Sequence, residues 1–301
     1  MAALFFVLFK KDIMQKLNFT GLLARRTYIM YAVFALFLIM VSYSNNSMAQ
    51  GDLLIYPKRI VFEGNKRAEQ LNLSNIGKDT ATYNISFVQY RMNENGSFQQ
   101  ITTPDTGQFF SDENLRFFPR TVTLGPNETQ TVKVQLIKSN LLAPGEYRSH
   151  MYFRAIHKAK PLGEKETGKD TSISIRLIPI FGISIPTIIR VGDYNAAVSL
   201  SNSKFQIQKD TIPVVNTKLN RTGSMSVYGD VTVNYISPQN QEIKVGTAKG
   251  VAVYSPTPSR NFEIKLNNLA GVNYHSGKLH IRYTDQSPKP VTLAEEEIIL
   301  N

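Results

Sequence analysis

An apolar stretch, Thr171–Arg190, constrains the fold of this chain more than any other part of the sequence. Every second residue from Ile173 to Ile185 is apolar, which is the period of an extended strand. The stretch is longer than a usual strand of about 5 or 6 residues, and it contains Pro179, which cannot donate a ladder hydrogen bond. We therefore expect an edge or bulged strand, whose open side could pair with a strand of another protein. The same pattern also fits a strand buried between two sheets and broken at Pro179.

The composition predicts an all-β protein. Val, Ile, Thr, Tyr and Phe recur in short runs between clusters of Gly, Pro and Asn, as is typical of strands joined by turns. The length of 301 residues allows about two domains. We predict two immunoglobulin-like β-sandwiches in tandem, an N-terminal one over residues 50–188 and a smaller one over 189–301, after a signal peptide over residues 1–49.

The signal-peptide prediction depends on an apolar run, Tyr28–Val41, that follows two arginines. The run is shorter than the ~20 residues that a membrane-spanning helix needs. Ser47 and Ala49 are small residues at the −3 and −1 positions of a cleavage site before Gln50. We therefore expect export, with an uncleaved N-terminal anchor as the alternative. Translation from Met14 would leave a conventional signal sequence.

The charge and the reactive residues favour no enzyme class. The net charge of +11 is spread along the chain without the dense basic block of a nucleic-acid-binding protein. The chain has no cysteine, and its four histidines lack metal-ligand spacing, so we predict no cofactor and no metal. Phosphate-binding and nucleophile-elbow motifs are also absent from the sequence.

Two local motifs define the predicted first sandwich. Asn93–Gly96 is a hairpin turn between two alternating runs. Leu142, a Pro-Gly turn and Tyr147 have the spacing of a tyrosine corner, which begins strand F of an immunoglobulin-like sandwich. The stretch at Thr171 would then be strand G. Leu269–Tyr274 repeats the Leu-to-Tyr spacing in the second half.

The second half predicts shorter strands. Residues 192–204 are small and polar, and we expect strands only after them. The expected strands are Phe205–Ile207, Val227–Tyr235, Val251–Tyr254, Asn261–Leu266, Lys278–Tyr283 and Ile298–Leu300.

The first half resembles the periplasmic pilus-assembly chaperones, the PapD-like family. The order of several segments supports this resemblance, which spans roughly Leu53–Pro186. The segments are Arg59–Gly64, the strand ending at Asn75, Pro119–Val134, Met151–Phe153, and the apolar strand that closes on Pro186. The departures described below mark a divergent member.

The resemblance implies a non-enzymatic chaperone that binds pilus or fimbrial subunits lacking their own last strand. In such proteins strand G lends alternating apolar side chains to the open groove of the subunit. Ile173, Ile175 and Leu177 occupy the matching positions, so the resemblance makes them the subunit-binding donor strand.

The family also anchors the C-terminal carboxylate of the subunit on two basic residues between the domains. Arg59 matches the first of these. Phe181 stands where the family has the second, a lysine, and Ile185 replaces an arginine next to the closing proline. The sequence leaves open whether Arg176 or Arg190 takes over either role.

The resemblance implies a periplasmic location and fimbrial subunits as partners. The sequence leaves open which subunit is bound, whether an outer-membrane usher takes part, and whether free molecules associate through the edge strand. The alternative function is a structural or adhesive surface protein made of immunoglobulin-like modules.

Overall fold

The computed structural model describes residues 52–156, 180–193, 195–209 and 211–300. The predicted signal peptide and cleavage site lie outside these residues. The described part is all-β, as predicted, with two short 3₁₀ helices, η1 (Asp112–Asn114) and η2 (Ser139–Leu141). No helix in those ranges is long and apolar enough to cross a membrane.

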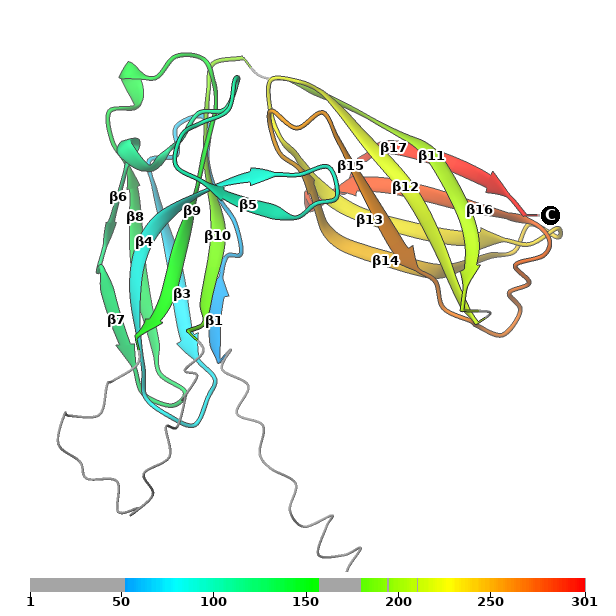
Figure 1. Ribbon diagram of the computed structural model, residues 1–301, viewed down its shortest axis with the longest axis horizontal. Helices are drawn as coiled ribbons and strands as arrows, with labels where there is room; N and C mark the ends of the chain where they lie inside the picture. The colour runs from blue at the N-terminus through cyan, green and yellow to red at the C-terminus, as the bar shows by residue number, and fades with distance from the viewer. Residues whose placement is uncertain (1–51, 157–179, 194, 210, 301) are drawn as a thin grey trace, which may run out of the picture. The chain divides into compact units, whose positions relative to one another are not determined.

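The first β-sandwich has two sheets (Figure 1). One has the strand order β1-β3-β8-β6, and the other has the order β2-β10-β9-β4-β5, with β7 also paired to β4. The bounds in the first sheet are β1 (Leu53–Tyr56), β3 (Ala68–Asn75), β8 (Thr129–Leu136) and β6 (Leu115–Phe118). Those in the second sheet are β2 (Ile60–Phe62), β10 (Gly182–Val191), β9 (Gly145–Ile156), β4 (Ala81–Met92), β5 (Phe98–Ile101) and β7 (Thr121–Leu124).

Alternating side chains from both sheets form the core of this sandwich. Leu71 and Val132 lie opposite each other on β3 and β8, and both are fully buried. Phe62 and Phe153 are fully buried on strands of the other sheet. Each such side chain contributes about 1.5–3 kcal/mol to folding through the apolar surface it removes from water.

The first strand changes sheets at Pro57. β1 pairs with β3 in one sheet, whereas β2 pairs in parallel with β10 in the other. Pro57, which cannot donate a ladder hydrogen bond, lies in the break between β1 and β2. The switch leaves β2 in contact with only the second half of β10, because the register joins Ile60–Phe62 to Thr187–Ile189.

The two local motifs of the first sandwich are confirmed. Asn93 donates its N–H to Ser97 O (2.9 Å) in the turn between β4 and β5, and Gly96 has the positive φ of 79° that this turn requires. The hydroxyl of Tyr147 donates to Ala143 O (3.1 Å), as a tyrosine corner should.

The second sandwich also has two sheets, with the strand orders β11-β12-β15 and β14-β13-β16-β17. The bounds are β11 (Ala196–Gln208), β12 (Ile212–Gly223), β15 (Ser259–Lys265), β14 (Glu242–Val253), β13 (Val227–Ile236), β16 (Lys278–Asp285) and β17 (Thr292–Ile299). Tyr235 and Tyr283 are among its largest fully buried side chains. The repeated Leu-to-Tyr motif has a matching bond here, from the hydroxyl of Tyr274 to Asn267 O (2.8 Å).

Part of the strand prediction for the second half is wrong. Residues 196–204 belong to the long strand β11, and the sequence interpretation missed β12. β11 does alternate, since Ala196, Val198 and Leu200 pack on the core, whereas Ala197 and Ser199 between them are exposed. The small size of these side chains hid the period of two. The predicted boundary between residues 188 and 189 stays a prediction; β10 itself ends at Val191.

We expect the tyrosine corner to contribute measurably to stability. Tyr147→Phe removes the hydroxyl that donates to Ala143 and keeps the ring, so the free energy of unfolding should fall by about 1 kcal/mol. Urea denaturation measures the change. The exposed Tyr56→Phe is the control and should stay within about 0.5 kcal/mol of wild type. Equal stability of the two variants would show that the corner bond is not stabilising.

Candidate functional site

The first half of β10 has an open edge. Gly182–Pro186 pair with His150–Arg154 of β9, and no described strand pairs with them on the other side. The second half differs, because β2 and β9 flank Thr187–Ile189 on both sides. In the part of the stretch that the structure describes, β10 is thus an edge strand before Pro186 and is flanked by strands on both sides after it, whereas Pro179 lies outside the described residues.

Apolar side chains are exposed at the start of this edge. Ile180, Phe181 and Ile183 are 51%, 45% and 36% exposed, whereas Ile185 is only 4% exposed and belongs to the core. An exposed apolar edge with free backbone groups is a template for another strand. Ile173, Ile175 and Leu177 lie outside the described residues, so their role as a donor strand stays a prediction. In the sequence, these three residues are an even number of positions from Ile183, which is the spacing of side chains on one face of a strand.

Arg59 lies just before β2 and faces the second sandwich. Its Cζ lies 4.5 Å from the centroid of the Tyr228 ring, a cation–π contact. Its Nη1 is buried and has no hydrogen-bond partner among the described residues. Burial lowers the pKa of the Arg59 guanidinium. A buried cation with an unpaired donor is costly, and an incoming anion would relieve that cost.

Two further arginines share this environment. Arg148 on β9 lies with its Cζ 4.3 Å from the centroid of the Tyr254 ring, and it donates through Nη1 to Ser255 O (3.0 Å) and through Nη2 to Tyr90 O (3.4 Å). Its Nε, like the Nε of Arg260, is buried without a partner in the described part of the chain. Burial lowers the pKa of both arginines. The region therefore has an excess of buried positive charge.

An aromatic cluster lies next to Arg148. The His150 ring is within 6.1 Å, centroid to centroid, of the rings of Tyr90, Phe98 and Tyr254. Burial and then the charge of Arg148 lower the pKa of His150 to about 3, so the imidazole is neutral at neutral pH. A neutral ring adds no further charge beside the arginines.

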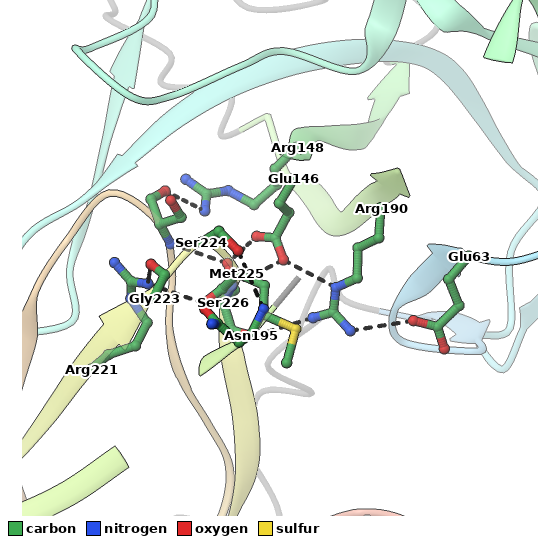
Figure 2. A network of polar contacts seen from close by, with 11 residues as sticks. Glu63, Glu146, Arg148, Arg190, Asn195, Arg221, Gly223, Ser224, Met225 and Ser226 are labelled. Atoms are coloured by element: carbon green, nitrogen blue, oxygen red, sulfur yellow. Dashed lines mark hydrogen bonds and ion pairs between the residues drawn. The ribbon is translucent and has the colours of Figure 1, made fainter. Parts of the chain in front are cut away.

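Glu146 on β9 is the buried acid of this region (Figure 2). Its Oε2 accepts from the N–H of Ser226 (3.0 Å) and from Nε of Arg190 (3.1 Å), and its Oε1 accepts from the hydroxyl of Ser226. Arg190 donates further to Ser226 O (3.1 Å) and to Glu63 (3.4 Å). Because Ser226 precedes β13, this network joins the two sandwiches.

The network answers part of the question that the sequence left open. Phe181 and Ile185 are apolar, so neither supplies a charge. Phe181 is half exposed, and Ile185 is in the core. Arg190, five residues beyond Ile185, supplies a basic contact to the second sandwich, as Arg148 also does through Ser255 O. Arg176 lies outside the described residues.

The sequence interpretation missed Glu146, Arg148 and Ser226. One signal was available: Glu146 and Arg148 flank the corner residue Tyr147, and β9, which contains all three, buries both charged side chains. Charged residues inside such a strand require partners. Nothing in the sequence identified Ser226 as the partner.

Comparisons with known proteins found one family model and a set of solved structures that are similar to this chain. A family model described as an Fn3-like domain matches residues 61–152. No curated protein matches the chain. Three of the solved structures that are similar to the chain are chaperones. They are YadV (12% identity, 83% of this chain and 100% of that chain, TM-score 0.41), CupB2 of Pseudomonas aeruginosa (12%, 82% and 100%, 0.39) and DraB of E. coli (11%, 83% and 96%, 0.36).

The described residues form two immunoglobulin-like β-sandwiches. The identity of the chain to eight similar solved structures is 9–14%. We base the functional proposal on the contacts of the chain itself.

We expect Glu146 to be essential for the contact between the sandwiches. Its side chain is 1% exposed, so Glu146→Ala leaves Arg190 and the Ser226 N–H without their buried acceptor and should lower the free energy of unfolding by about 3 kcal/mol. Glu63→Ala is the matched control, because Glu63 is the half-exposed partner of the same arginine and should contribute less than about 1 kcal/mol. Chemical denaturation of the two variants measures both values. Similar losses in the two variants would contradict this assignment.

Proposed function

We propose that this protein is a periplasmic chaperone that binds fimbrial-type subunits by donating a β-strand along the open edge of β10. The observation that supports the proposal most directly is the pairing of Gly182–Pro186 on one side only, next to exposed apolar side chains. The sequence resemblance assigns strand donation to Ile173, Ile175 and Leu177, which precede β10 in the same apolar stretch.

The open edge would contribute in two ways. Free backbone groups of the edge form a ladder with a strand of the subunit and fix its register. Ile183, together with Ile173, Ile175 and Leu177, then enters the apolar groove that the missing strand of the subunit leaves open. Each fully buried side chain contributes about 1.5–3 kcal/mol before the ordering of the segment is subtracted.

Arg59 would bind the C-terminal carboxylate of the subunit. Its buried Nη1 lacks an acceptor among the described residues, and a carboxylate supplies the acceptor and the negative charge together. The neighbouring Arg148 adds positive potential, although its own Nη1 and Nη2 are bonded to backbone carbonyls. One anchored carboxylate would fix the register between β10 and the subunit strand that pairs with it.

Export fits this role. Residues 1–49 would be removed as a signal peptide in the periplasm, and a cysteine-free chain folds there without disulfide chemistry. The two domains would be residues 50–188 and 189–301.

We expect Ile183→Asp to abolish most subunit binding. A charge would enter an apolar groove, and the affinity should fall at least tenfold. The probe is a fimbrial subunit of the native host, identified by its co-purification with the wild-type protein and measured by titration calorimetry. Ile175→Asp tests the predicted donor residues in the same assay.

Ile207→Asp on β11 is the control for these two variants. Ile207 is 43% exposed on a strand of the second sandwich, so it matches Ile183 in residue type and exposure and should bind as wild type does. Wild-type affinity of both Ile183→Asp and Ile175→Asp would rule out strand donation through β10. Recovery of the protein on the cell surface instead of in the periplasm would favour an adhesive role.

If Arg59 binds the C-terminal carboxylate, the effect of Arg59→Ala should depend on whether the C-terminus of the subunit is free. Arg59→Ala should weaken binding of a subunit with a free C-terminus about tenfold or more, since hydrogen bonds to charged groups contribute about 1.5–3 kcal/mol. The same subunit extended by a few residues at its C-terminus should bind wild type weakly and should show little further loss with Arg59→Ala. Equal losses for the two subunit forms would place the carboxylate elsewhere. Arg59→Lys keeps the charge but loses the fork, so intermediate binding is expected.

A further inference from the structure

The hairpin of β4 and β5 makes hydrogen bonds to the second sandwich. Its tip lies between Met92 and Phe98, which are paired at the end of the two strands. The hydroxyl of Thr257 donates to Met92 O (2.8 Å), and the N–H of Asn261 donates to Glu94 O (2.6 Å). The first sandwich thus supplies two backbone acceptors to the second.

One of these bonds covers a sheet edge. β15 is an outer strand of the sheet β11-β12-β15, so one row of its backbone groups has no strand partner in the described structure. The bond from Asn261 to Glu94 fills part of that row. The hydroxyl of Ser259, on the same strand, lies 3.4 Å from the Glu94 carboxylate. The hairpin tip therefore acts as a partial edge partner, which protects this edge from other strands.

Apolar and cationic contacts strengthen the same junction. Met92 is buried in a cluster with Ile188, Ala252 and Tyr254, and it has residues of both sandwiches around it. Gly96 lies against the guanidinium of Arg260, because a Cβ built at Gly96 would be 2.7 Å from Arg260 Cζ. Any side chain larger than hydrogen at position 96 would displace that guanidinium.

The junction matters because the Arg59 region draws on both sandwiches. Arg59 belongs to the first, whereas Tyr228 and Tyr254 belong to the second. Domains joined by a short connection move relative to each other unless their interface holds them. Such motion would separate Arg59 from Tyr228.

We propose that the β4–β5 hairpin is an interdomain latch that holds the second sandwich in place and thereby keeps Arg59 stacked on Tyr228 before a subunit arrives. Met92, Glu94 and Gly96 are positioning residues in this proposal. Opening the latch lowers the fraction of molecules with a formed Arg59 site, and the apparent affinity for a subunit falls by the same factor. This last consequence rests on the proposed chaperone function; the latch itself does not.

The absence of cysteine from the chain makes the latch directly measurable. Cysteines introduced at the exposed Lys133 on β8 and Lys244 on β14 accept spin labels without background, one on each sandwich. Pulsed electron resonance then gives the distribution of distances between the sandwiches. The wild-type background should give one narrow distribution.

Two variants open the latch and one controls for backbone strain. Gly96→Ala displaces Arg260, and Thr257→Val removes the hydroxyl that binds Met92 while keeping the side-chain shape. Gly64→Ala imposes a similar strain, since Gly64 also has positive φ (56°), but a Cβ there meets nothing within 4 Å. Circular dichroism checks that all three variants are folded.

We expect Gly96→Ala and Thr257→Val to broaden the distance distribution at least twofold and to weaken subunit binding about threefold to tenfold, with Gly64→Ala unchanged in both assays. Distributions as narrow as wild type in both latch variants would overturn the latch, whatever the binding data show. Broadened distributions with wild-type subunit affinity would overturn its positioning role. Arg59→Ala separates the two proposals. If this variant binds the subunit with wild-type affinity while the latch variants have broadened distance distributions, the role of Arg59 as carboxylate anchor is wrong and the latch is supported.

Discussion

The two edges of β10 are the constraint on which the rest of the structure depends. Every β-strand presents backbone donors and acceptors on both sides, and each side must be paired, covered or exposed. In β10 the pairing changes at Pro186, where β2 begins to cover the second edge. Both halves of β10 pair with β9, and within the described part of the chain only the second half is also paired along its other edge.

This division explains why the first strand changes sheets. A single strand from Leu53 to Phe62 paired along all of β10 would close the edge that the proposed function requires. The break at Pro57 instead places β1 beside β3 and leaves only β2 beside β10. Pro186, which cannot donate to a ladder, lies where the pairing changes.

The buried charged groups between the sandwiches differ in how many hydrogen-bond partners they have. This number distinguishes structural groups from groups that are available to a ligand. Glu146 accepts three hydrogen bonds from Ser226 and Arg190, so it is a completed structural contact. Arg59 stacks on Tyr228, and its Nη1 has no hydrogen-bond partner within the residues that the structure describes, so it retains capacity for an anion. The two groups lie in the same region, and the number of partners separates their roles.

The sequence by itself determined the all-β class, the tyrosine corner and the apolar strand, because strand period and turn chemistry are local properties. Local pattern failed at β11, where Ala196 and Val198 are too small to mark a period clearly. Only the tertiary structure decided that Arg190 supplies the contact to the second sandwich and that the β4–β5 hairpin reaches Thr257 and Asn261. The bond from Arg190 to Ser226 joins residues 36 positions apart, and the bond from Thr257 to Met92 joins residues 165 positions apart. No local spacing encodes which distant groups a folded chain brings together.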